Sequence, residues 1–147
     1  MPAVGAELRR EQKSQRFAGF RRVIVATDFG QAGARAIRRA VGLPLGIGAE
    51  ILLVHVLPGG VPLSAASVVA GAAEQRLDAA RRMAARMLNR RGRRDIGLAT
   101  RLARGDAAPE IARMAGRFKA DLIVVGRGGA RPLSGTLLGS TAQRVVR

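Results

Sequence analysis

The chain has 147 residues, which suits one domain built around a single hydrophobic core. Hydrophobic residues make up 48% of the sequence and charged residues 24%, values typical of a globular protein. It contains no cysteine, which excludes disulfides, thiolate catalysis and cysteine–zinc sites.

The apolar runs are too short to span a bilayer, and the N-terminal sequence lacks the apolar core of a secretory signal. We therefore expect a cytoplasmic protein that does not enter a membrane.

The net charge is +16, carried almost wholly by arginine. From Arg76 to Arg104 ten arginines face only Asp78 and Asp95, so this segment carries +8 (ten minus two), half of the total. Such a run is typical of a solvated helix face, which is the interpretation we favour. The alternative is a surface for nucleic acid, although the chain has no Tyr or Trp on which bases could stack.

Residues 1–20 mix charged residues with Gly and Ala without a sustained period, and we expect them to form a flexible N-terminal extension before a domain over 21–147. A short β-branched run at 22–28 predicts a buried strand. Apolar residues then recur at helical spacing, at Ala34, Ile37 and Val41. The helix is expected to end at the breakers Pro44, Gly46 and Gly48.

Residues 51–56 are nearly continuous in apolar side chains and predict the second strand. A long helix is expected from about residue 67 to 91, ended by Gly92. Its apolar stripe consists of Leu77, Ala80, Ala84, Met87 and Leu88.

Residues 96–102 predict a third strand, which Gly97 weakens and so favours at a sheet edge. Asp106 is expected to cap the next helix by accepting hydrogen bonds from the free amides of its first turn. The buried face of that helix is Ile111, Met114, Ala115 and Phe118. Residues 121–125 predict a fourth buried strand that runs directly into Gly126.

Strands that alternate with helices predict an α/β fold with an open parallel sheet and helices on both faces, as in Rossmann-like folds. Ligands of such sheets bind outside the carboxyl ends of the strands, where the strand order reverses. Asp28 and Gly126 both stand at predicted carboxyl ends, so the binding site is expected there.

The segment 126–141, GRGGARPLSGTLLGST, is rich in glycine. Glycines allow backbone amides to approach a phosphate, and a helix that opens at Gly139 and Ser140 would add unpaired amides. The segment is neither a Walker motif nor a dinucleotide fingerprint, and a tight turn without a ligand is an equal alternative on this evidence alone.

The spacing of Gly126, Gly129, Gly139 and Ser140 resembles the nucleotide-binding pattern of the ATP-binding universal stress proteins. Four further segments resemble the first strand, second strand, third-helix entry and fourth strand of that family: VIVATDF at 23–29, LLVHV at 52–56, GDAAPEI at 105–111 and ADLIVVG at 120–126. The match covers about residues 21–147.

The resemblance implies ATP as the ligand, and leaves open whether Mg²⁺ accompanies it. It places Asp28 beside the adenosine, Ala26 at the same mouth, and the backbone of Val56 against adenine. It implies that Gly126, Gly129, Gly139 and Ser140 bind the ribose and phosphates, and that Arg127, Gly128 and Thr141 complete the binding site as their neighbours. No residue is assigned to catalysis or as a resident metal ligand. Asp28 could instead be a turn residue that caps the first helix, and His55 is expected to be structural.

Family members usually continue into a fifth strand that commonly forms the dimer contact, whereas this sequence ends at Arg147. We therefore expect residues 121–125 to form a sheet edge, a known association hazard, and leave a homodimer open. At Gly30 many relatives carry serine; its absence removes a helix cap but not the phosphate site.

The resemblance implies an ATP-binding stress-response or regulatory module. Slow ATP hydrolysis or autophosphorylation on Ser140 or Thr141 is the enzymatic alternative, and the sequence shows no group other than Asp28 to position water. The remaining alternatives are a nucleotide-free interaction module and a nucleic-acid-associated protein.

Overall fold

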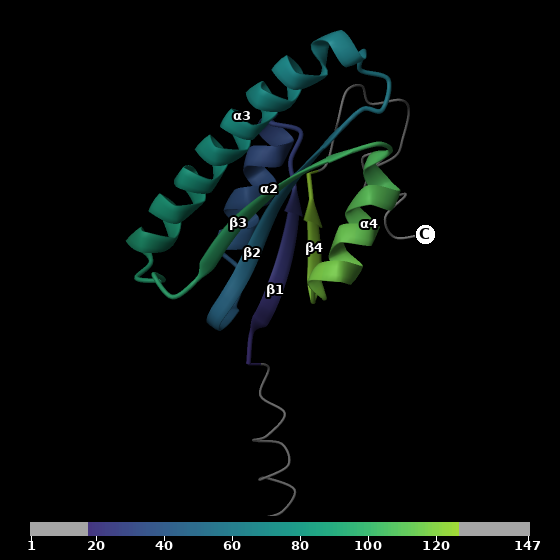
Figure 1. The fold of residues 1–147 in the computed structure, drawn as a ribbon. Helices are drawn as coiled ribbons and strands as arrows, with labels where there is room; N and C mark the ends of the chain where they lie inside the picture. Colours follow the sequence, from purple (N-terminus) through teal and green to yellow (C-terminus); the bar gives the residue numbers. More distant parts are fainter. Residues whose placement is uncertain (1–17, 127–147) are drawn as a thin grey trace, which may run out of the picture.

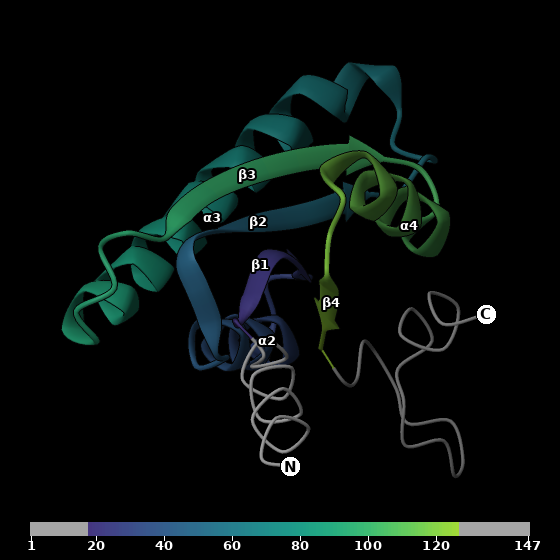
Figure 2. The ribbon, with the colours of Figure 1, turned by 90° about the horizontal axis from the view of Figure 1, so that it is seen from below.

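The computed structural model describes residues 18–126 as one parallel sheet with three helices. The strands are β1 (Phe20–Ala26), β2 (Leu45–Leu57), β3 (Gly97–Arg104) and β4 (Leu122–Val125). The helices are α2 (Gln31–Val41), α3 (Leu63–Arg90) and α4 (Ala107–Phe118). The strand order is β3-β2-β1-β4, and all neighbours are parallel (Figures 1 and 2).

Strand β1 lies inside the sheet and is buried on both faces. Val23, Ile24 and Val25 are each 0% exposed, because side chains alternate between the two faces of a strand and both faces are covered. Val23 and Val25 belong to one apolar cluster, whereas Ile24 belongs to the other.

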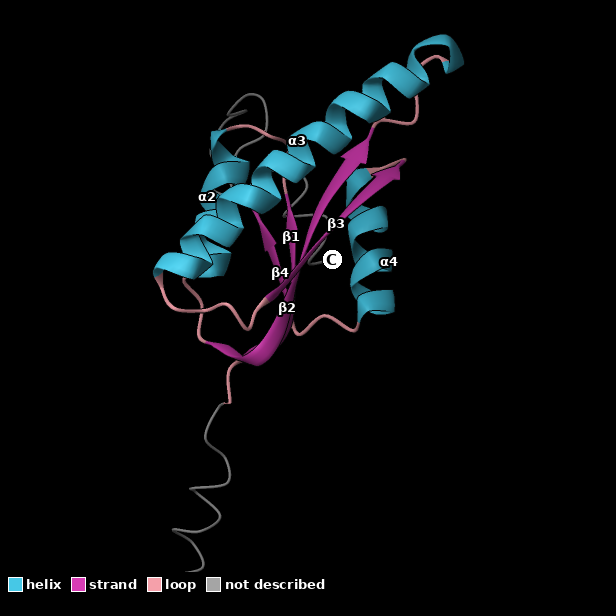
Figure 3. Cartoon of the chain, turned by 60° about the vertical axis from the view of Figure 1, so that its left-hand side comes forward, coloured by secondary structure: helices cyan, strands magenta, loops and turns pink. Residues whose placement is uncertain are grey.

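The two clusters lie on opposite faces of the sheet. Helices α2 and α3 cover the first cluster, which includes Ile37 and Leu77, and α4 covers the second through Ile111 and Met114 (Figure 3). The crossovers through α2 and α3 lie on one face of the sheet, and the crossover through α4 lies on the other. The strands are therefore added in one direction from β1 to β3, and β4 is added on the opposite side of β1.

The predicted fold class is confirmed: the sheet is parallel, open and covered on both faces. The placement of Gly97 on an edge strand is also confirmed, since β3 is the first strand of the order. The expectation about a fifth strand, and the helix expected to open at Gly139, fall on residues 127–147 and lie outside the described residues. So do residues 1–17 of the expected extension; β1 itself begins at Phe20.

The start of β2 differs from the sequence prediction. Helix α2 ends at Val41 and β2 begins at Leu45, so Gly46 and Gly48 lie within a strand and do not end the helix. Leu45 pairs with Phe20, and Glu50 pairs with Arg22, so five steps along β2 match two steps along β1. The three extra residues of β2 form an irregular segment, in which Gly48 has a φ of 68°.

The loop before β3 holds this irregular segment in place. The Arg93 guanidinium donates to the carbonyl oxygens of Leu45 (3.0 Å) and Gly46 (2.9 Å), and the amide of Gly48 donates to the Asp95 carboxylate (2.9 Å). Arg93 also pairs with Asp95 at 3.0 Å. These long-range contacts explain why two glycines that look like breakers remain within a strand.

The ends of α3 and α4 test the capping predictions. Gly92 has a φ of 70°, and the amides of Gly92 and Arg93 donate to the carbonyls of Asn89 and Leu88, which is a Schellman motif that confirms Gly92 as the terminator. The capping role of Asp106 is wrong: it is the N-cap residue of α4, but its side chain makes no capping hydrogen bond.

We predict that Asp95 contributes to stability only above acid pH. The hydrogen bond from Arg93, followed by that from the Gly48 amide, holds the pKa of Asp95 well below its ordinary value. A carboxyl group whose pKa is lower in the folded state stabilises the fold above its unfolded pKa of about 4, and this contribution is lost as the pH falls below that value. Urea titrations of Asp95→Asn between pH 7 and 2.5 should therefore show a shallower pH dependence than the parent.

Glu74→Gln is the control for this experiment, because it removes the same charge from an exposed carboxylate of α3. Among the described residues 18–126, Glu74 forms no ion pair. If the free energy of unfolding of Asp95→Asn changed with pH as steeply as that of the parent, the carboxylate would not hold the β2 segment.

Candidate functional site

The carboxyl ends of three strands meet at one edge of the sheet. Ala26, the last residue of β1, pairs with Val54 of β2 on one side and with Val125 of β4 on the other. The chain continues from β1 to β2 on one side, and it later returns through α4 to β4 on the other side of β1, so the strand order reverses between β1 and β4. This is the position at which open α/β sheets bind their ligands.

The turn from β1 into α2 is held by its own side chains. The Thr27 hydroxyl accepts a hydrogen bond from the Phe29 amide (3.0 Å), and the Asp28 carboxylate accepts one from the Gly30 amide (2.9 Å). Phe29 adopts a φ of 65°, a left-handed conformation that is strained for a residue with a side chain. The bond between Asp28 and the Gly30 amide supports the alternative in which Asp28 is a turn residue. The carboxylate is exposed at the sheet edge, and this bond uses only its Oδ1.

His55 ties the ends of β1 and β2 together. Its Nδ1 lies 2.7 Å from the carbonyl oxygen of Thr27, and since a carbonyl only accepts, Nδ1 carries the proton. The ring also lies against Phe29, with the two ring centroids 4.3 Å apart. His55 is thus a structural residue, as the sequence predicted.

Two glycines at this edge are required for packing. A Cβ on Gly126 would lie 2.7 Å from the carbonyl group of Ala32 in the first turn of α2, and one on Gly33 would lie 2.3 Å from the Thr27 hydroxyl. Gly126 therefore has a reason to be glycine that does not depend on a ligand: it brings the end of β4 close to the start of α2.

The backbone of Val56 is directed past the end of β1. The Val54 carbonyl accepts from the Thr27 amide on the β1 side, and the Leu57 carbonyl accepts from the Gly105 amide on the β3 side. Since peptide groups of alternate residues in a strand face the same side, the amide and carbonyl of Val56 face the β1 side, beyond the last paired residue of β1.

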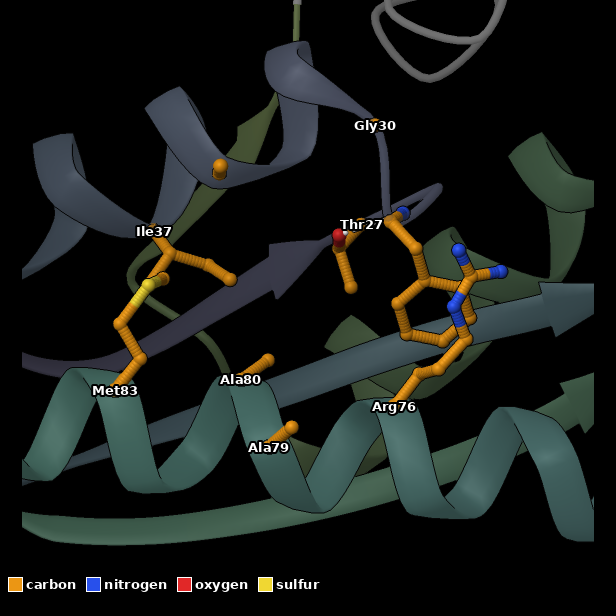
Figure 4. Close-up of a pocket in the computed structure, with 9 residues that line it drawn as sticks. Thr27, Gly30, Ile37, Arg76, Ala79, Ala80 and Met83 are labelled. Atoms are coloured by element: carbon orange, nitrogen blue, oxygen red, sulfur yellow. Dashed lines mark hydrogen bonds between the residues drawn. The ribbon is translucent and has the colours of Figure 1, made fainter.

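A cavity of about 230 Å³ lies beside this edge, between α2 and α3. Figure 4 shows Thr27 and Gly30 on one side and Arg76, Ala79, Ala80 and Met83 of α3 on the other, with Ile37 of α2. The Arg76 guanidinium lies 4.9 Å from the centroid of the Phe29 ring, a cation–π contact at the mouth of the cavity.

The structure brings four of the predicted site residues to one edge: Ala26, Asp28, Val56 and Gly126. The other six lie outside the described residues: Arg127, Gly128, Gly129, Gly139, Ser140 and Thr141. In the described part of the chain no cluster of three or more His, Asp or Glu side chains could hold a metal ion.

Sequence reasoning missed Thr27, Phe29, Gly33 and Arg76. The first two had a signal, because polar residues and a glycine directly after a strand indicate a tight turn over a helix N-terminus. The other two had none, since Gly33 is explained by a contact with Thr27, and Arg76 approaches Phe29 from 47 residues away in the sequence.

The arginine-rich segment does not form one solvated face. Arg81 and Arg82 pair with Asp78, Arg93 bonds to β2, and Arg76 covers Phe29. Arg101 and Arg104 belong to β3. Thus the charges of the segment are divided between a helix on one face of the sheet and an edge strand.

The model of the universal stress protein family matches residues 19–147. The chain belongs to this family. Its fold is also that of solved universal stress proteins. UspA from Lactobacillus plantarum is 20% identical, with a TM-score of 0.67 over 86% of this chain and 90% of that chain. A family protein from Burkholderia pseudomallei is 24% identical, with a TM-score of 0.60 over 85% and 86%.

A third similar structure is a universal stress protein in complex with cAMP. It is 24% identical, with a TM-score of 0.55 over 87% of this chain and 89% of that chain. Curated protein sequences give no match. None of the described helices of this family member is long and apolar enough to cross a membrane.

We predict opposite effects of two Gly→Ala substitutions in helices. Gly33→Ala forces a methyl group against Thr27 and should lower the free energy of unfolding by about 1–3 kcal/mol. Gly71→Ala in α3 meets no atom within 4 Å and should raise it by about 0.5–1 kcal/mol. Chemical denaturation of both variants is the measurement, and equal effects would contradict the packing described at this turn.

Proposed function

We propose that the chain is an adenine-nucleotide-binding regulatory module of the cytoplasm, with ATP as its ligand. The observation that carries the proposal is the meeting of β1, β2 and β4 at the point where the strand order reverses. Asp28, Val56 and Gly126 stand at this point on three different strand ends.

The proposal assigns a chemical role to each group at the edge. The amide and carbonyl of Val56 have the polarity to recognise the donor and acceptor edge of adenine. The Asp28 carboxylate keeps acceptor capacity beyond its bond to Gly30 and can bind ribose hydroxyls or a phosphate-bound Mg²⁺. For the phosphates we propose the sequence 126–141, whose glycines and hydroxyls would supply donors.

Nucleotide binding by a relative supports this assignment. The similar universal stress protein in complex with cAMP binds an adenine nucleotide. For this chain we favour ATP, because Gly126, Gly129, Gly139 and Ser140 keep the spacing of the ATP-binding pattern. The proposal leaves open a homodimer. Sedimentation of the chain with and without ATP tests for it.

We favour a regulatory role over fast catalysis. At the described sheet edge the Nδ1 proton of His55 is donated to the Thr27 carbonyl, and the proposal assigns the remaining acceptor capacity of Asp28 to ribose or to a phosphate-bound Mg²⁺. A phosphoryl-transfer enzyme needs a group that positions water or a hydroxyl nucleophile. The output would be a change in conformation or in partner choice.

The direct experiment is calorimetric titration of the full chain with ATP, AMP and cAMP, preceded by identification of any nucleotide released from the purified protein by heat. We expect saturable binding of ATP and retention without rapid turnover of labelled ATP. Gly139→Val should abolish binding in a folded protein, because a branched side chain would occupy the phosphate position. Absence of adenine nucleotide binding under saturating conditions would contradict the proposal.

The two roles of Asp28 can be separated by two substitutions. Asp28→Asn keeps a side-chain oxygen that can accept from Gly30 but removes the charge, so its melting temperature should stay near that of the parent. If the carboxylate binds ribose or a metal–phosphate group, ATP affinity should fall about tenfold. Asp28→Ala removes the turn bond as well and should also melt earlier.

Unchanged ATP affinity in Asp28→Asn, together with a lower melting temperature in Asp28→Ala, would assign Asp28 to the turn alone. Glu74→Gln is the matched control for the loss of one exposed negative charge, because Glu74 belongs to α3 and not to a strand end.

A further inference from the structure

A second hollow lies on the other side of the domain, between edge strand β3 and helix α4. We call it the β3–α4 groove; its volume is about 540 Å³. Its floor includes the apolar side chains of Leu52, Met114 and Phe118. Its remaining lining includes four arginines, two from each element: Arg101 and Arg104 of β3, and Arg113 and Arg117 of α4.

The groove exists because β3 carries small side chains where α4 would otherwise pack. The register pairs Leu52 with Ala99 and Val54 with Arg101, so Ala99, Arg101 and Ala103 share the face of the sheet on which α4 lies. Alanines on both sides of Arg101 leave the space above the strand open. Figure 2 shows α4 beside β3 on this face.

The charges around the groove are largely uncompensated. Arg113 pairs with Glu110, whereas Arg101, Arg104 and Arg117 make no ion pair with any residue of the described part of the chain. Like charges from two walls that converge on one apolar hollow are complementary to an anion that has an apolar body.

We propose that the β3–α4 groove binds a small amphipathic anion, an aliphatic or aromatic body that carries a carboxylate, sulfonate or phosphate. The apolar floor would contact the body, and Arg101 and Arg117, from opposite walls, would bind the head group. This site is distinct from the nucleotide site, which uses the ends of β1, β2 and β4.

The composition of the groove argues against two other occupants. A nucleic-acid strand needs stacking platforms, and the only aromatic side chain in this lining is Phe118. The arginines of α3 lie on the opposite face of the sheet and do not extend the groove. A second copy of the chain, paired along the edge of β3, would bring Arg101 and Arg104 close to the same like charges.

The test uses the full chain and the fluorescence of 8-anilinonaphthalene-1-sulfonate, with decanoate as a competing anion. We expect saturable fluorescence that decanoate displaces, both with and without saturating ATP. Arg101→Gln should weaken decanoate binding about tenfold. Arg39→Gln, an exposed arginine of α2 on the other face, makes the same charge change and should alter it less than twofold.

A third variant separates an apolar hollow from a merely positive surface. Ala99→Leu keeps all four arginines but fills the floor, so it should also weaken decanoate at least tenfold, with unchanged circular dichroism as evidence of folding. Equal decanoate affinity in the parent, Arg101→Gln and Ala99→Leu would overturn the proposal. So would displacement of the dye by a thymidine oligonucleotide, but not by decanoate, with the steep salt dependence of phosphate contacts.

These outcomes are independent of the nucleotide proposal. A chain that binds decanoate through Arg101 but shows no ATP binding would keep the groove and lose the proposed nucleotide function. Complete displacement of the dye by ATP, with Arg101→Gln equal to the parent, would place the dye in the nucleotide site and overturn the groove.

Discussion

Strand β1 is buried on both faces of the sheet and contacts β2, β4, α2 and α4 directly. Val23 and Val25 face the cluster under α2 and α3, and Ile24 faces the cluster under α4, all at 0% exposure. Because β2 and β4 pair with opposite edges of the same short strand, β4 ends level with β1, at Val125 opposite Ala26, and β2 continues past both to Leu57. The candidate binding edge is a consequence of how the core is built.

The turn that leaves β1 shows how packing prepares that edge. Phe29 is held in a strained conformation by the Thr27 hydroxyl and by its contacts with His55 and Arg76. Strained backbone of this kind persists only where its surroundings fix it. Gly126 meanwhile allows β4 to end against the first turn of α2. A preformed edge costs little reorganisation when a ligand binds.

The sequence was sufficient to predict the strand–helix alternation, the parallel sheet and the edge position of the strand that contains Gly97. These follow from local apolar periodicity and from chain connectivity. The beginning of β2 could not be predicted, because Gly46 and Gly48 are kept in a strand by Arg93 and Asp95, more than 40 residues away. Asp106 has the right residue type for a cap, but residue type does not fix the rotamer that a capping bond requires.

For the site, sequence reasoning found the residues that stand directly after strands, such as Asp28 and Gly126, because connectivity alone brings carboxyl ends together. It did not find residues that reach the edge from the side, such as Arg76. Nor did it find the β3–α4 groove, whose arginines come from an edge strand and the helix that follows it and line one hollow only once that helix packs on the sheet. Pairing between elements is a tertiary property that periodicity does not report.

The most direct measurement of the central claim is an ATP titration of the ¹⁵N-labelled chain followed by amide chemical shifts. Binding where the strand order reverses predicts saturable shifts at Thr27, Asp28, Val56 and Gly126, with none at Gly46 and Gly48 at the opposite end of the sheet. Saturable shifts that leave these four amides unmoved, or that lie along β3 and α4, would contradict the assignment of the nucleotide to the carboxyl end of β1.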